Sequence, residues 1–155
     1  MSESYLPFLI SVVTSIAGCS TQAPPKVEEG QQKISVIIEN ISPTSGVLRV
    51  ALYNSKSHWL SDNGIVRARL VMVDESPEKL EFWGLPSGEY GIAVYHDINS
   101  NNVMDKKYFV IPNEAYGFSN NARGSFGLGS PGFNKAKFAV PQKKPQRILL
   151  EQPPI

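Results

Sequence analysis

The segment GEYGIAVYH, residues 88–96, decides the fold class of this chain. It places Tyr90, Ile92 and Val94 at every second position, and such side chains share one face of an extended strand because successive side chains point to opposite sides. Aromatic and β-branched residues also favour strands over helices. The segment therefore predicts a β-strand that buries one face against a core.

Short apolar runs of the same kind occur along most of the chain, separated by residues that favour turns. The predicted strands span 34–39, 46–53, 66–73, 79–85, 88–96, 135–140 and 146–151. The first two, joined through Ser42, Pro43 and Gly46, are expected to form an antiparallel pair. Residues 57–60 are expected to form a turn or a brief helix. About seven short strands without a convincing amphipathic helix predict an all-β fold, a single antiparallel, immunoglobulin-like β-sandwich with one long irregular loop.

The composition excludes some classes of partner. The 155 residues contain 15 Lys and Arg against 14 Asp and Glu, a formal net charge of +1. A near-neutral chain has no electrostatic footprint for nucleic acid. We interpret the small basic cluster of Lys143, Lys144 and Arg147 as a solvated flank of a strand and not as a docking patch. The oligomeric state is left open.

The amino-terminal residues resemble an export signal. Residues 5–17 (YLPFLISVVTSIA) form an apolar run too short to span a bilayer, and Ile16-Ala17-Gly18-Cys19 resembles a bacterial lipobox. The resemblance implies that Cys19 is lipidated and becomes the first mature residue. Against it, residues 1–4 carry no Lys or Arg, which a start codon further upstream would explain. The alternative is a buried free cysteine after an ordinary core segment.

This interpretation divides the chain into four parts. They are a signal peptide at 1–18, lipidated Cys19 with a flexible tether over 19–32, a β-sandwich domain at 33–152 and a tail at 153–155. The protein is then expected in the bacterial cell envelope, anchored to a membrane on its periplasmic or outer-surface face. Cys19 is the only cysteine, so no intramolecular disulfide can form.

The run DINSNNVMD, residues 97–105, predicts a cation site. Oxygen-bearing side chains recur at every second position, and this spacing suits calcium, which takes about six to eight oxygen ligands. The predicted ligands are the side chains of Asp97, Asn99, Asn101 and Asp105 and the carbonyl of Val103. Tyr108 stands where an EF-hand loop has its bidentate Glu, so we expect a structural site of weak affinity, roughly 0.1 to 1 mM. The alternative is an Asn-rich turn that bonds its own backbone.

Residues 112–134 lack a strand pattern and contain several aromatic residues among glycines. Long loops in compact domains are usually functional or disordered, and the aromatic residues argue against disorder. The candidate ligand-binding residues are Tyr116, Phe118, Asn120, Asn121 and Arg123, whose rings and polar groups suit sugars or peptides. The favoured alternative is a structural loop over an open end of the sandwich, with Phe118 and Phe126 in the core and the two asparagines bonded to turn backbone.

Three motifs together carry a family resemblance. Leu85-Pro86-Ser87-Gly88-Glu89-Tyr90, then HDINSN at 96–101, then YGFSNNARG at 116–124 resemble the bacterial domain-of-unknown-function family numbered 2141, over residues 33–152. The resemblance implies exported proteins with a prealbumin-like sandwich, and it implies no reaction. The chain departs from the family pattern after Gly127, where LGSPGF at 128–133 replaces a Pro-rich aromatic continuation.

Support for catalysis is slight, and no catalytic residue is predicted. His96 and Asp97 are adjacent on a strand end, so their side chains point to opposite faces, and no serine lies in a G-x-S-x-G motif. We therefore expect a non-enzymatic, lipid-anchored envelope module with a structural calcium loop that binds a protein or a glycan. The alternative is an enzyme or enzyme accessory that acts on envelope polysaccharide or peptide, with the Asp97 loop at its site.

Overall fold

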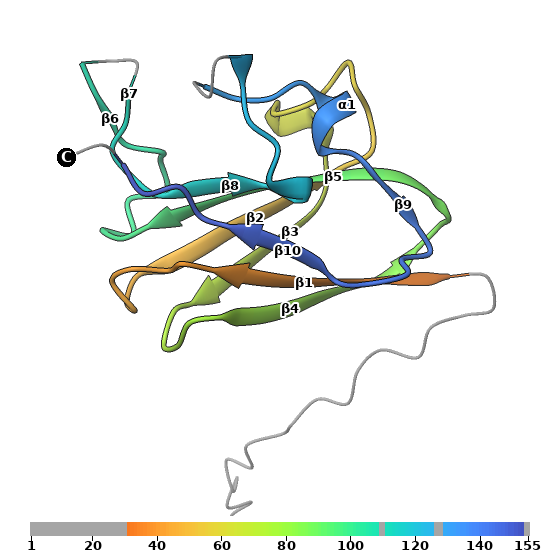
Figure 1. The fold of residues 1–155 in the computed structure, drawn as a ribbon, viewed down its shortest axis with the longest axis horizontal. Coiled ribbons are helices and arrows are strands. Elements are labelled where there is room, and N and C mark those ends of the chain that lie inside the picture. The colour runs from red at the N-terminus through yellow and green to blue at the C-terminus, as the bar shows by residue number, and fades with distance from the viewer. Residues whose placement is uncertain (1–30, 109–110, 126–128, 154–155) are drawn as a thin grey trace, which may run out of the picture.

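The computed structural model describes residues 31–108, 111–125 and 129–153, and the elements given below lie within these ranges (Figure 1). The predicted signal peptide, Cys19, the tether up to residue 30 and Phe126 lie outside them. Within the described ranges no helix is long and apolar enough to cross a membrane. The chain is nearly all β, as its alternating apolar segments predicted.

One layer of the sandwich is a three-stranded sheet. Its order is β10 (Gln146–Leu149), β1 (Gln32–Glu39) and β4 (Glu78–Leu85). β1 and β4 are antiparallel, whereas β1 and β10 are parallel, so the predicted purely antiparallel arrangement is wrong at this pair. Parallel pairing joins strands that are distant in sequence, and local turn signals do not report it.

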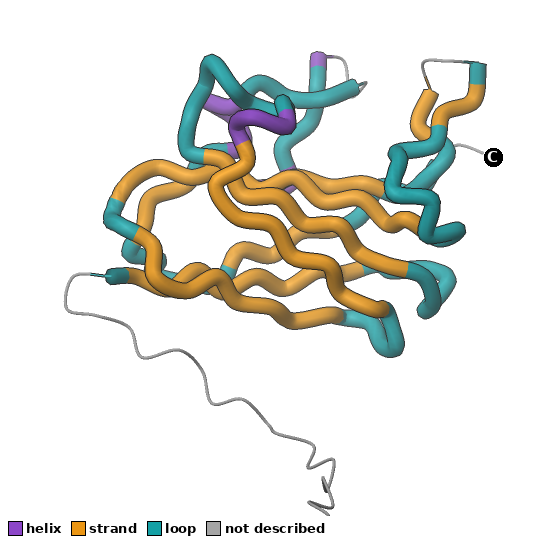
Figure 2. The backbone as a smooth tube through the Cα atoms, turned by 180° about the vertical axis from the view of Figure 1, so that it is seen from behind, coloured by secondary structure: helices purple, strands orange, loops and turns teal. Residues whose placement is uncertain are grey.

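The other layer is a five-stranded sheet in which β5 is central. β3 (Ile65–Met72), β2 (Val47–Tyr53), β5 (Gly88–Asp97) and β8 (Tyr116–Phe118) follow one another, and β9 (Phe138–Val140) pairs with the start of β5. Figure 2 shows the two stacked layers from behind, with the short helical segments on the outer side of one layer. The predicted metal loop begins at Asp97, the last residue of β5, so this strand fixes where the loop starts.

The core lies between the two sheets. Every second residue of β1, β2 and β5 faces inward, and the side chains buried there include those of Ile34, Val36, Ile38, Leu48, Val50, Leu52, Ile92 and Val94. Tyr90 is buried as well, and its hydroxyl donates a hydrogen bond to the Pro86 carbonyl at 2.9 Å, which secures the turn into β5. Burial of this apolar surface is the main source of stability in such a fold.

The predicted pairing of 34–39 with 46–53 is wrong, because β1 and β2 belong to different sheets. Residues 40–46 pass from one layer to the other and bury Ile41 at the end of the core. Gly46 has φ +84°, and a Cβ there would lie 2.8 Å from the Asp97 carbonyl oxygen. The same Pro, Ser and Gly residues suit a hairpin and an arch between layers, so the local sequence did not distinguish the two.

Two other predictions need correction. The segment 135–140 is a strand only over its last three residues, because Phe133–Ala136 forms the short helix α1. The segment 112–134 is not wholly irregular, because it contains β8 and the 3₁₀ turn η2 (Ser119–Asn121), while a small hairpin pairs β6 (Lys106–Lys107) with β7 (Ile111–Pro112). Strands of two or three residues are too short to produce a periodic signal.

The sandwich has two chemically different ends. At the tether end, where the described chain begins, Gln32 pairs with Leu85 and Gly88 pairs with Val140. At the loop end, Val47 pairs with both Met72 and Asp97. The tether end lies on the right of Figure 1, and the loop end, with β6 and β7, lies on the left.

Candidate functional site

Asp97 ends β5 as a fully buried carboxylate held by three donors. The Arg49 Nε atom donates to its Oδ2 at 2.6 Å, and the backbone amides of Asn101 and Asn102 donate to Oδ1 and Oδ2 at 3.0 and 2.9 Å. Burial acts to raise the pKa of Asp97, but the hydrogen bonds from Arg49, Asn102 and Asn101 outweigh it and hold the pKa below its usual value. Asp97 is therefore an anion that closes the loop onto β2.

Asp105 gathers the asparagines of the loop. The Asn99 Nδ2 atom lies 2.8 Å from Asp105 Oδ2, and Asn101 Nδ2 lies 3.0 Å from Asp105 Oδ1. The side-chain oxygens of these asparagines accept the backbone amides of Asn101 and Val103 at 3.1 and 2.9 Å. Side-chain oxygens that bond the backbone two residues further on are typical of Asx turns. Asn99, Asn101 and Asp105 thus converge at one point.

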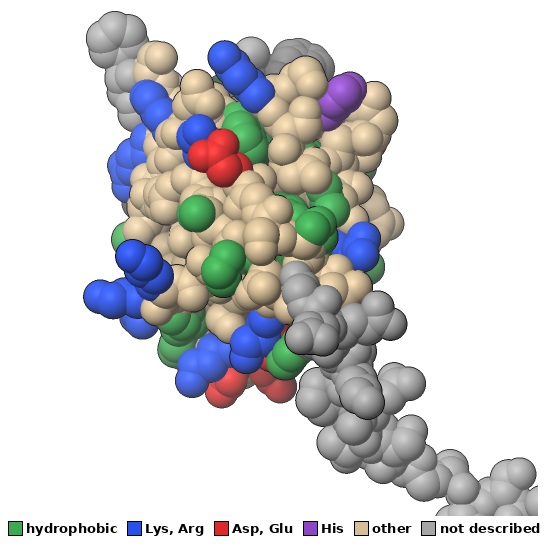
Figure 3. Space-filling model, turned by 90° about the vertical axis from the view of Figure 1, so that its right-hand side faces the viewer, with side chains coloured by type: hydrophobic (Ala, Val, Ile, Leu, Met, Phe, Trp, Pro, Cys, Tyr) green, Lys and Arg blue, Asp and Glu red, His purple; other side chains and the backbone are tan. Residues whose placement is uncertain are grey.

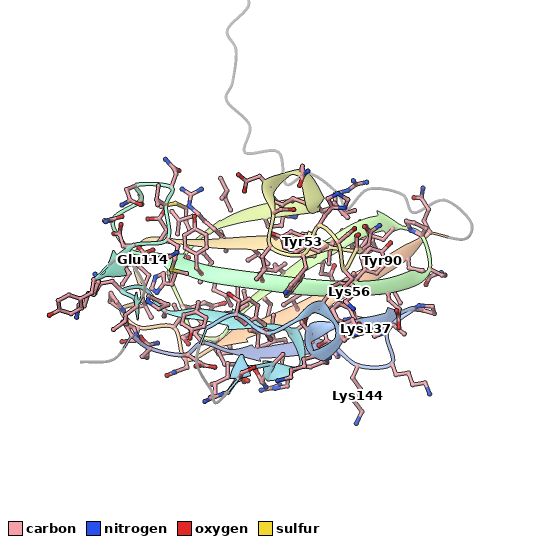
Figure 4. All side chains as sticks on the ribbon, turned by 90° about the horizontal axis from the view of Figure 1, so that it is seen from above. Tyr53, Lys56, Tyr90, Glu114, Lys137 and Lys144 are labelled. Atoms are coloured by element: carbon pink, nitrogen blue, oxygen red, sulfur yellow. The ribbon has the colours of Figure 1, made fainter. Side chains whose placement is uncertain are left out.

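Glu114 is part of this site, although the sequence analysis missed it. Its side chain is 3% exposed, and its carboxylate accepts the backbone amides of Ile98 at 3.2 Å and Asp105 at 3.1 Å. Burial raises its pKa, the two backbone hydrogen bonds oppose the rise, and the charges of Asp105 and Asp97 add to it. Figure 4 labels Glu114 at the loop end. It follows a two-residue strand, so no pattern in the sequence marked it.

The five predicted ligands do not form one coordination shell as they stand. Asp97 is directed to Arg49, and Val103 is an exposed residue whose amide is bonded to Asn101. Among the described residues, no group of three or more His, Cys, Asp or Glu side chains is placed to hold a metal ion. The residues that fit a cation are Asn99, Asn101 and Asp105, because amide and carboxylate oxygens are the ligands that calcium prefers.

The second set of predicted residues begins in β8, which pairs with β5, and continues through η2 to Arg123. Phe118 is buried against Trp59 at 6.1 Å between ring centroids, in a small cluster outside the main core. Asn120 Nδ2 donates to the Lys137 carbonyl at 2.8 Å, and Asn121 Oδ1 accepts the Leu149 amide at 2.8 Å. These contacts tie the segment to Lys137, which lies between α1 and β9, and to β10.

The two remaining residues of this set also have protein partners. Tyr116 is half-buried, its ring lies 5.9 Å from that of Phe118, and its backbone bonds to Glu151. Arg123 forms an ion pair with Glu151 at 3.1 Å. Within the described ranges no hydrogen bond or ion pair joins these five residues to the 97–105 loop, so the two predicted sites are separate.

His96 and Asp97 have different partners, as expected for neighbours on a strand. His96 is buried on the core face, and its Nε2 lies 2.6 Å from the Ser45 carbonyl, while its Nδ1 has no hydrogen-bond partner among the described residues. Asp97 lies on the outer face against Arg49. The two side chains therefore do not form an acid–base couple.

Comparison with known proteins identifies a family. Residues 36–148, more than half of the chain, match the sequence model of a family described as "uncharacterized protein conserved in bacteria (DUF2141)". No match was found among curated proteins or among solved structures. The matched residues include most of both sheets and the whole 97–105 loop, and only residues 32–35 of β1 and Leu149 of β10 lie outside the match.

Proposed function

We propose that this chain, which belongs to the DUF2141 family of uncharacterized bacterial proteins, is a non-enzymatic envelope module, anchored through lipidated Cys19, with a calcium-binding loop at 97–105. The observation that carries the metal proposal is that the side chains of Asn99 and Asn101 surround the Asp105 carboxylate, with their Nδ2 atoms 2.8 and 3.0 Å from its oxygens. Calcium would require each amide to turn its oxygen toward Asp105. Asp97 and Glu114 brace the loop from behind through backbone amides.

The charges of the site favour a cation. Three carboxylates, those of Asp97, Asp105 and Glu114, lie around one loop, and Arg49 forms the one ion pair with them among the described residues. Each asparagine oxygen that accepts a backbone amide retains a second lone pair. When bound, calcium would offset the repulsion between Asp105 and Glu114, and Asn99, Asn101 and Asp105 would hold it.

The bonding of the carboxylates supports a role without catalysis. A general acid must carry a proton near neutral pH, whereas Asp97 has a lowered pKa and is bonded to Arg49. Both oxygens of Glu114 are occupied by backbone amides in a buried position. We propose an envelope protein or glycan as the partner, met by the exposed Asn120, Asn121 and Arg123 beside Tyr116 and Phe118.

Thermal unfolding with calcium and with chelator tests the metal. Calcium at a hundredfold excess over its dissociation constant should stabilise the folded chain by about 2.7 kcal/mol. The variant Asp105→Asn should lose this response, and the matched variant Asp62→Asn, in the exposed 3₁₀ turn η1 (Asp62–Gly64), should keep it. No calcium response in the unaltered protein would refute the site.

Two further measurements test the other parts of the proposal. Mass spectrometry of membrane fractions should find the amino-terminal peptide beginning at a diacylated Cys19, and an unmodified peptide would refute the anchor. Turnover on envelope glycans or on ester substrates, abolished by Asp105→Asn, would contradict the non-enzymatic role.

A further inference from the structure

We propose that the tether end of the sandwich docks on an anionic phospholipid bilayer, with Lys143 and Lys144 as its main contacts. This inference rests in part on the proposed anchor, because the anchor brings that end to a membrane. It also changes the interpretation of the basic cluster at 143–147, which from sequence alone was assigned to a solvated strand flank.

The fold places these lysines beside the point where the chain enters the sandwich. The turn 141–145 joins β9 to β10, and the Gln142 side chain accepts the Ser35 amide of β1 at 2.7 Å. Gln32, three residues earlier in β1, pairs with Leu85. The basic turn, the first residues of β1 and the β4–β5 turn therefore share one end of the molecule.

The charge at this end is positive after ion pairing. Lys33 pairs with Glu81 at 2.8 Å and Lys137 pairs with Glu89 at 2.9 Å, so these four groups cancel. Lys143 and Lys144 are exposed and form no ion pair with any described residue. Figure 4 shows Lys144 extending away from the body of the molecule. Each lysine near an anionic bilayer contributes roughly a fivefold preference for that surface.

The same end also presents groups that favour a membrane interface. Trp83 is half-buried near the end of β4, with Lys33 Nζ 4.8 Å from its ring centroid, and Pro86 and Pro141 are exposed. Trp and Lys are the residues that typically lie at headgroup level, because each combines an apolar part with a polar tip. Figure 3 faces this end and shows hydrophobic side chains between basic ones at its margin.

The tether makes this contact geometrically accessible. Gln31 lies 12 residues after Cys19, a stretch that reaches at most about 40 Å when extended. β5, with 10 residues, is roughly 33 Å long and separates the two ends. A tether of this length alone would leave the domain free to rotate, whereas the basic face selects one orientation. In that orientation the 97–105 loop points away from the bilayer.

The test is a lysine-labelling footprint on the full chain held in vesicles. Vesicles of phosphatidylcholine with a quarter phosphatidylglycerol are compared with vesicles of phosphatidylcholine alone, and acylation rates are read by mass spectrometry. Lys143 and Lys144 should react roughly fivefold or more slowly on the anionic vesicles. Lys106 and Lys107, the exposed pair in β6 at the loop end, are the internal control and should react equally on both.

Charge-reversal variants complete the test. In Lys143→Glu/Lys144→Glu, the protection of Lys33 on anionic vesicles should disappear, whereas in the matched variant Lys106→Glu/Lys107→Glu it should persist. Glu28 and Glu29 of the tether are present in all variants, so their negative charges contribute equally and do not affect the comparison. Equal rates on both vesicle types, or equal protection of both lysine pairs, would overturn the docking face.

Whether Cys19 is lipidated is measured separately from the docking face. The intact mass of the vesicle-bound chain shows whether Cys19 carries acyl groups. If it does not, vesicle flotation selects the chains that remain bound, and the footprint is read on those chains alone. An unlipidated chain with protected Lys143 and Lys144 would refute the anchor and support the docking face.

Discussion

At the scale of single residues, the two aspartates of the loop have different roles. Asp97 is fully buried and holds Arg49 and two backbone amides, whereas Asp105 is half-buried and collects two asparagine side chains. From the spacing of the loop alone, both aspartates were predicted as metal ligands. The surroundings of each side chain, which the spacing does not contain, make Asp97 a structural anion and Asp105 the candidate ligand.

Asp97→Asn should destabilise the fold by about 2 kcal/mol at pH 7, with or without calcium, because Arg49 loses its charged partner. The lowered pKa of Asp97 means that its contribution is present above its usual value of 3.8 and is lost as the pH falls through the folded pKa. In urea unfolding, the difference between the original protein and the variant should therefore shrink below about pH 4.

The stability contribution of Glu114 depends on pH in the opposite direction, but it does not affect the comparison between the original protein and Asp97→Asn. Its raised pKa contributes stability at low pH that is lost as the pH rises through its folded value. Both proteins contain Glu114, so its contribution cancels in the difference. A difference that stays constant from pH 6 to pH 3 would contradict the charged role of Asp97.

At the scale of elements, the arch at 40–46 was predicted wrongly as a hairpin turn, whereas the edge strand β3 lies within one residue of its predicted bounds, 66–73. Gly46 touches the Asp97 loop, so the arch sets the loop's position. β3 lies at the edge of its sheet, and Leu70 and Met72 are 66% and 73% exposed. Arg69 of the same strand donates to the Glu81 carbonyl of β4 at 3.3 Å, which occupies part of the neighbouring edge.

Gly46→Ala should cost at least about 1 kcal/mol, because the backbone has φ +84° and the new Cβ would lie 2.8 Å from the Asp97 carbonyl oxygen. It should also weaken the calcium response by displacing the loop. The matched variant Gly132→Ala meets no atom within 4 Å and should leave both unchanged. Urea unfolding and calcium-dependent melting measure the two effects, and equal stability of the two variants would contradict the close approach.

The same leucine-to-alanine substitution can be compared on the edge strand, as Leu70→Ala, and in the core, as Leu52→Ala. Leu52 is fully buried, so its truncation should cost about 3 kcal/mol, whereas the exposed Leu70 should cost less than about 0.5 kcal/mol. Leu70→Lys with Met72→Lys should in addition reduce self-association in sedimentation velocity, because exposed apolar edge strands favour strand pairing between molecules. A large loss of stability from Leu70→Ala would show that β3 is covered in solution.

At the scale of the whole molecule, two ends with different charge lie at opposite ends of β5. The loop end carries three carboxylates, two of them buried, beside Arg49 and the β6 lysines, whereas the tether end carries Lys143 and Lys144 without an acidic partner among the described residues. Their separation of roughly 33 Å is several Debye lengths at physiological ionic strength. The two ends should therefore act independently.

The independence of the two ends is tested by measuring each variant in the assay that reports on the opposite end. Asp105→Asn should leave the vesicle protection of Lys143 and Lys144 unchanged, and Lys143→Glu/Lys144→Glu should leave the calcium-induced melting shift within about 0.5 kcal/mol. Melting and lysine labelling on the same preparations measure both effects. A calcium effect on the vesicle footprint that Asp105→Asn abolishes would contradict independence, because the direct screening of anionic headgroups by calcium is the same for both proteins.

The sequence by itself determined the fold class, the family and the oxygen-rich loop. Alternation of apolar side chains and turn residues are local signals, and 88–96 and 97–105 contain them in full. Tertiary structure alone decided that β1 and β2 belong to different sheets and that the 141–145 turn lies beside β1. It also decided that Asp97 pairs with Arg49 and that Glu114 joins the loop. The physical reason is that these contacts join residues distant in sequence, where a pattern of period two contains no information on which strands become neighbours.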